Sequence, residues 1–252
     1  ALFLVESGRV LGLERHLETG IGAARTALRA CAREFRPGGL YTGSAGVLAT
    51  VAELSAVVGG GDGEELRRET GRLVDGMVGS ARTSTEPDLL IGHAGEIAAL
   101  LRLAAALGRP ELMDHAVEVG LEVCRSAVPR GEGVGWVVGV ERTPRVLAGF
   151  THGGAGIAYA LGLLHRVAPR PEFRETARRA ILGEDTFLRA GQANWLDARA
   201  GDALERFSFY WCHGLPGILL SRLEASRIDP GDGELTRTVE WATEELARRV
   251  RE

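Results

Sequence analysis

Three side chains suited to catalysis or metal binding, Cys212, His152 and Asp88, each lie one to four residues before a glycine that opens a helical pattern. A helix N-terminus favours a thiolate over a thiol, so a cysteine at such a place can be a metal ligand or a nucleophile. Histidine is the side chain that most readily exchanges protons near neutral pH. The ordinary alternatives stay open: a buried, inert cysteine and an aspartate that caps its helix.

These residues belong to a repeat. The unit Gly-x-x-Gly occurs four times, each time before an apolar run, at Gly43/Gly46, Gly92/Gly95, Gly153/Gly156 and Gly214/Gly217. The first glycines are 49, 61 and 61 residues apart, long enough for one helix that begins at the glycines and a second that returns beside it. Glycine also lets backbones approach closely at a helix start. We therefore expect stacked helical hairpins whose helix starts converge on one place.

Two kinds of helix are expected. Apolar residues recur every three or four positions directly after the glycine pairs, in 47–58, 97–104, 157–164 and 218–223, which predicts an inner set. Charged amphipathic patterns at 21–31, 66–77, 117–124 and 239–246 predict an outer, solvated layer. Cys31 and Cys124 fall on the apolar spacing of outer helices, so we assign both to the core. The predicted fold class is all-α, with inner and outer helices built from hairpin repeats.

Two segments interrupt this helical rhythm. Residues 131–140 contain valines and Trp136 among glycines, which predicts a short β excursion. Residues 183–209 form a long connection that contains Asn194-Trp195-Leu196-Asp197. Long connections in compact domains often carry function.

Composition limits the classes of function. The chain has 252 residues, a hydrophobic content of 45% and a net charge of −4, without a basic block that would suggest a nucleic-acid partner. No apolar run approaches the roughly 20 residues of a membrane span, so we expect no membrane partner and a cytoplasmic protein. Three cysteines, an odd number, favour reduced thiols over a disulfide framework. We expect one domain over residues 1–252.

Taken in order, the glycine motifs resemble those of the lanthionine synthetase C-like family. They are Asp88-Leu-Leu-Ile-Gly-His-Ala-Gly95, His152-Gly-Gly-Ala-Gly-Ile157 and Trp211-Cys-His-Gly-Leu-Pro-Gly-Ile218. The last of them, together with Asn194-Trp195, most resembles the cyclase domain of bifunctional class II lanthipeptide synthetases. The resemblance implies an α/α toroid with a zinc ion at its central mouth. There a cysteine thiol of a precursor peptide adds to a dehydrated serine or threonine and closes a thioether (lanthionine) ring.

The resemblance also implies roles and partners. Cys212 would be a zinc ligand, His152 an acid/base or enolate-stabilising group, and Asp88 a second such group. The implied substrate is a precursor peptide with a leader and dehydrated residues. A dehydratase or kinase-like domain is expected upstream of the cyclase, fused to it.

The family's two further zinc ligands, an adjacent Cys-His pair in a later inner repeat, are not found in this chain. One more step of the repeat would pass the end of the sequence, which lies within an expected outer helix. Either the sequence is a piece of a longer synthetase, with the toroid incomplete at its C-terminal end, or the protein lacks these ligands. Cys212-His213 is not the later pair, because Trp211 and Pro216 match the earlier motif, so His213 is not among the expected ligands.

Two other functions compete with the cyclase. One is a cyclase-like module that binds a peptide without catalysing ring closure, which an incomplete zinc site would favour. The other is an α/α-toroid glycosidase, which needs two carboxylates facing one cavity. Asp88 and Glu96 are the candidate pair near a glycine motif.

Overall fold

The computed structural model describes residues 1–36, 38–79, 86–139, 144–200 and 205–251. Ten α-helices in these residues form five hairpins. They are α1 (Leu2–Leu11) with α2 (Glu14–Arg33), α3 (Ser44–Val58) with α4 (Gly60–Gly79), α5 (His93–Leu107) with α6 (Leu112–Arg125), α7 (Gly154–Val167) with α8 (Pro171–Asp185), and α9 (Leu215–Ile228) with α10 (Gly233–Arg251).

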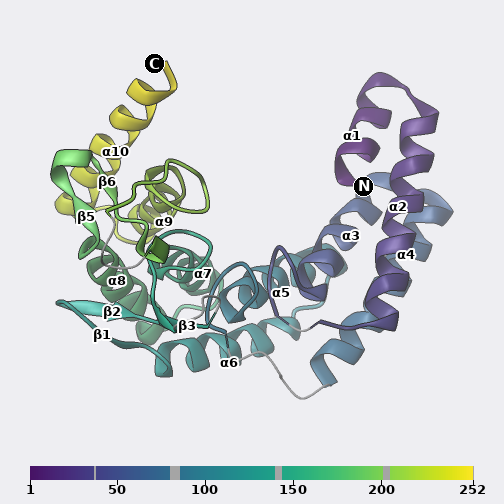
Figure 1. Ribbon diagram of the computed structural model, residues 1–252. Coiled ribbons are helices and arrows are strands. Elements are labelled where there is room, and N and C mark those ends of the chain that lie inside the picture. The colour runs from purple at the N-terminus through teal and green to yellow at the C-terminus, as the bar shows by residue number, and fades with distance from the viewer. Residues whose placement is uncertain (37, 80–85, 140–143, 201–204, 252) are drawn as a thin grey trace.

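The hairpins follow an arc, with the first and last hairpins at its two ends (Figure 1). The odd-numbered helices lie on the inside, where α3 packs on α5, α5 on α7 and α7 on α9. Each even-numbered helix returns along the outside against its own inner partner. The stacked hairpins and the two layers expected from the glycine repeat are confirmed. The helix α1 was not expected from the apolar pattern.

Burial explains the two layers. Inner helix α5 is apolar on nearly all sides and buries nine of its residues, because helices or loops cover it all round. Outer helix α2 buries only one stripe, which includes Cys31 as predicted. Cys124 is half-buried and packs against the core, so it lies at the edge of the core to which it was assigned. The buried stripe of α6 runs through Ala116, Val119 and Val123, and one further residue turns Cys124 by about 100° to the edge of that stripe.

Short strands occupy the two interruptions. β1 (Val128–Arg130) pairs antiparallel with β2 (Gly133–Gly135), and β3 (Val137–Val138) pairs with β4 (Arg145–Val146). The β excursion predicted for 131–140 is therefore confirmed, except that residue 140 lies outside the described residues. The long connection holds β5 (Leu188–Arg189) and β6 (Asn194–Trp195), with 3-10 turns η1 (Ala190–Gln192) and η2 (Ala198–Ala200).

The segments that precede α3, α5, α7 and α9, residues 38–43, 86–92, 147–153 and 208–214, are called the inner loops here. Each inner loop is hydrogen-bonded to the next one through its backbone. Leu40 N donates to Leu89 O (3.3 Å), Leu89 N to Thr151 O (3.1 Å), and Phe150 N to Cys212 O (3.1 Å). Each donor lies three residues before the first glycine of its pair, so a chain of backbone hydrogen bonds gathers the four helix starts along the inside of the arc.

The glycine motifs make this approach possible. At Gly156, the second glycine of its pair, an added Cβ would overlap the carbonyl oxygen of Phe150. The same overlap occurs between Gly217 and the carbonyl oxygen of Trp211. A larger residue would push the inner loop away from its own helix.

In the part of the chain that the structure describes, no helix combines the length and the hydropathy that a membrane span requires.

Candidate functional site

The inner loops bring Asp88 and His152 into direct contact. Asp88 lies in the loop before α5 and His152 in the loop before α7, and Asp88 Oδ2 is 2.6 Å from His152 Nδ1. The Asp88 side chain is fully buried, whereas 13% of the His152 side chain is exposed. The imidazole is therefore the part of this pair that reaches the surface.

Asp88 also holds the loop that precedes α5. Its Oδ1 accepts hydrogen bonds from Ile91 N (2.8 Å) and Gly92 N (3.1 Å). Both amides precede the first residue of α5, so one carboxylate oxygen fixes the loop and the other contacts the histidine. A residue tied at both oxygens holds the imidazole in one orientation.

Cys212 joins this arrangement through its backbone. Its carbonyl oxygen accepts hydrogen bonds from Phe150 N, from Thr151 N (3.2 Å) and from Thr151 Oγ1 (3.2 Å), all in the loop that carries His152. Cys212 is a free, half-buried thiol. The three residues expected to act together thus lie on inner loops that are hydrogen-bonded to one another.

His213 serves the structure of this region. It is buried, Nδ1 lies 3.3 Å from Ala148 O and Nε2 lies 3.4 Å from Thr151 Oγ1. Its ring centroid is 6.1 Å from that of His152. Burial, together with the nearby positive charge of Arg199, lowers the pKa of His213, so the ring is neutral near pH 7.

Two exposed aromatic rings also meet at the inner loops. Tyr41, before α3, and Trp211, before α9, have ring centroids 5.0 Å apart. They are 53% and 46% exposed, an unusual state for rings of this size. Their contact joins the first and fourth inner loops, so the four loops gather around one region.

The residues present do not fit a catalytic zinc site. Such a site needs three protein ligands. No group of three or more His, Cys, Asp or Glu side chains that could hold a metal occurs in the ranges that the structure describes. Nδ1 of His213 is engaged by the carbonyl oxygen of Ala148, and Nδ1 of His152 is engaged by Asp88.

Two further buried residues of this region were not among the expected site residues. Glu184, on outer helix α8, accepts hydrogen bonds from Gly149 N and Ala155 N, on either side of His152. Asn194 Oδ1 accepts from Leu215 N (2.9 Å), at the start of α9. Asn194 lies in the long connection noted for possible function, but no sequence pattern distinguishes Glu184 from the other acids of the outer helices.

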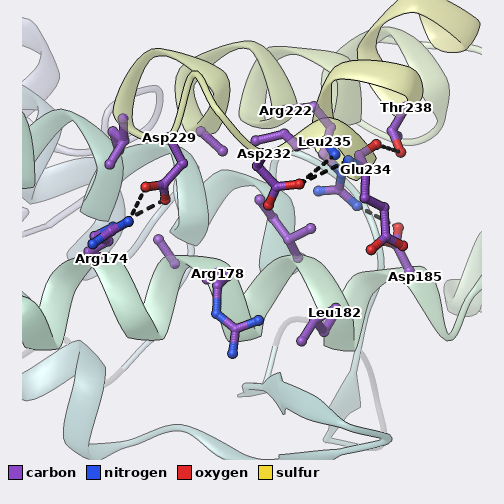
Figure 2. Close-up of a pocket in the computed structure, with 14 residues that line it drawn as sticks. Arg174, Arg178, Leu182, Asp185, Arg222, Asp229, Asp232, Glu234, Leu235 and Thr238 are labelled. Atoms are coloured by element: carbon purple, nitrogen blue, oxygen red, sulfur yellow. Dashed lines mark hydrogen bonds and ion pairs between the residues drawn. The ribbon is translucent and has the colours of Figure 1, made fainter.

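A pocket outside this region lies on the outer wall, between α8 and the α9–α10 hairpin (Figure 2). None of its lining residues belongs to the inner loops. Figure 2 shows Arg174 paired with Asp229, and Asp232 bonded to the first turn of α10. Because these charges are satisfied within the chain, we interpret the pocket as a seam between helices.

Comparisons with known proteins agree with this architecture. The model of a family described as "Lanthionine synthetase C-like protein" matches residues 1–249. The solved structure of a protein named "Nisin cyclase" aligns with a TM-score of 0.53 and 15% sequence identity, over 95% of this chain and 76% of that chain. A likeness at this identity shows a shared fold, so the expected α/α toroid is confirmed. A search of curated proteins gives no match.

Proposed function

The chain belongs to the lanthionine synthetase C-like family, and from this premise we propose that it is a lanthipeptide cyclase domain, formed by residues 1–252. Its substrate would be a precursor peptide that carries a leader, a cysteine and a dehydrated serine or threonine. The observation that carries the proposal is the 2.6 Å contact between Asp88 and His152, which lie at two of the motif positions.

The reaction is an addition without a leaving group. A bond forms between the peptide sulfur and the β-carbon of the dehydrated residue, the thiol gives up its proton, and the α-carbon gains one. His152 can serve both proton transfers, because Asp88 engages Nδ1 and leaves Nε2 for the peptide. Asp88 is fully buried, so we propose it as a positioning residue that acts through His152.

The family resemblance implies zinc, with Cys212 as one ligand. Zinc, where bound, makes a thiolate available near neutral pH. Since the described residues do not supply three ligands, the proposal assigns no step to the metal.

The test is ring closure on a synthetic peptide with one cysteine and one dehydroalanine, near pH 7, with and without added zinc. Ring closure leaves the mass unchanged, so thiol alkylation followed by mass spectrometry separates cyclic from linear peptide. His152→Ala and Asp88→Asn should slow closure by roughly 100-fold or more, as is typical when acid–base catalysis is lost. His115→Ala, on outer helix α6, is the matched control and should leave the rate unchanged. Closure at the parent rate in both site variants would remove these roles.

A second candidate is a peptide-binding module that does not close rings. The observation that favours it is the missing ligand group among the described residues. The same peptide distinguishes the two functions, because a binding module retains it on the protein, with an unchanged thiol, whether or not zinc is added.

The glycosidase alternative is not favoured. Its two carboxylates must reach the sugar from either side of the bond that breaks. Asp88 is fully buried, and its oxygens are engaged by His152 and by the backbone. It is therefore not free to pair with Glu96 on a substrate.

A further inference from the structure

Glu184 reaches from the last turn of outer helix α8 to the loop that carries His152. Its Oε1 accepts a hydrogen bond from Gly149 N (2.6 Å), three residues before the histidine, and its Oε2 accepts one from Ala155 N (3.2 Å), three residues after it. The side chain is buried. One carboxylate thus ties both ends of the His152 segment.

The segment has further anchors at its centre. Phe150 N and Thr151 N donate to the carbonyl oxygen of Cys212, and the His152 ring is held by Asp88. These anchors come from neighbouring inner loops, whereas Glu184 alone comes from the outer layer among the anchors that we describe. Glu184 therefore connects the outer helix to the position of the imidazole.

We propose that Glu184 is a positioning residue for His152, whose ionised carboxylate holds both ends of the histidine segment so that the imidazole stays on Asp88. This inference rests on the proposed role of His152. It extends that role to a residue on the outer layer.

The charge state of Glu184 decides whether both bonds form. A carboxylate offers an acceptor to each amide, whereas a protonated carboxyl turns one O–H donor toward an N–H donor. Burial raises the pKa of Glu184 to about 7, with the neighbouring Asp185 adding to the rise, while the two backbone hydrogen bonds and Arg222 oppose it. The two hydrogen bonds from Gly149 N and Ala155 N to Glu184 should therefore weaken as the pH falls below neutral.

The experiment compares Glu184→Gln with the parent protein by NMR, without any ring-closure assay. A glutamine has a single acceptor oxygen, so one amide must face its NH₂ group. Losing one buried hydrogen bond corresponds to about tenfold faster exchange at Gly149 or Ala155. The NMR signals of the His152 ring should change position as well, because its contact with Asp88 loosens. Glu175→Gln, an exposed acid on the same helix, is the control and should change neither signal.

Unchanged amide protection together with unchanged His152 ring signals in Glu184→Gln would overturn the proposal. If this variant does not fold, the parent protein provides the test: the Gly149 and Ala155 amide signals should titrate together near neutral pH. Amide signals that stay constant from pH 5 to 8, a window about the pKa near 7, would also overturn it. Because none of these measurements uses ring closure, a failure here is distinct from a failure of the proposed cyclase function.

Discussion

Replacing Gly149 by alanine tests the contact that joins the third and fourth inner loops. Gly149 has φ +114°, a backbone conformation that residues with a Cβ rarely adopt. An added Cβ would lie 2.7 Å from the carbonyl oxygen of Cys212 and 3.0 Å from His213 Nδ1. The change therefore adds both backbone strain and overlap with backbone, at the place where the His152 loop meets the Cys212 loop.

The expected loss of stability is the sum of two effects. The unfavourable φ costs about 1–2 kcal/mol, and forcing a methyl group into packed backbone costs about 1–3 kcal/mol more. We expect Gly149→Ala to lower the free energy of unfolding by about 3 kcal/mol. For a protein of this size that corresponds to a fall in Tm of roughly 6–12 °C.

Urea denaturation followed by circular dichroism measures the change, with equal m-values as the check that the unfolded states are comparable. Gly22→Ala is the matched control. Gly22 is exposed within α2, and an added Cβ there meets nothing within 4 Å. Alanine at this position should stabilise the helix by about 0.5–1 kcal/mol. If Gly149→Ala is neutral or stabilising like the control, the third and fourth inner loops do not meet as described.

Three further predictions concern stability, metal content and helix capping. As the pH rises from 4.5, the ordinary pKa of a glutamate, to 7, the parent should lose about 3 kcal/mol of stability relative to Glu184→Gln. The reason is that Glu184 loses its proton near pH 4.5 in the unfolded chain but only near pH 7 in the folded protein. Parallel urea curves across that range would contradict it. Elemental analysis of the purified 252-residue chain should find well under one zinc per molecule, because the described residues contain no group of three ligands. Stoichiometric zinc that resists a chelator would contradict this. Asn194→Ala should lower the free energy of unfolding by about 2 kcal/mol, since Leu215 N and Trp195 N lose their acceptor; a change below the error of the urea curves would show that solvent or the backbone replaces this cap.

The layers of the fold could be predicted because the pattern is local and repeated. The second glycine of each Gly-x-x-Gly unit packs against the carbonyl oxygen of a residue in the inner loop just before it. The steric requirement for glycine therefore arises within a few residues of the helix that it affects. The apolar spacing likewise distinguishes a helix covered on all sides from one that shows a face to water. Cys31 and Cys124 mark the limit of this reasoning. Both fit the apolar spacing of an outer helix, but Cys31 is buried and Cys124, one position from its buried stripe, is half-buried at the edge of the core.

The candidate site could be predicted only in part. His152 and His213 share one position in the repeat, and only His152 meets a carboxylate, because the loop before α5 supplies Asp88 and the loop before α7 supplies a carbonyl oxygen. Glu184 is one of several acids in the outer helices, and its burial depends on how α8 packs against the start of α7.

By itself the sequence determined the helical hairpins, their inner and outer layers and the places where each inner helix begins, since short-range spacing and local steric limits control these features. Only the tertiary structure decided which polar groups meet. The contact of Asp88 with His152 and the Tyr41–Trp211 pair join residues from different hairpins. The two hydrogen bonds of Glu184 join the outer helix of one hairpin to the start of its inner helix. Such contacts depend on how the curvature of the arc aligns successive loops, a property of helix packing that no single segment of the sequence contains.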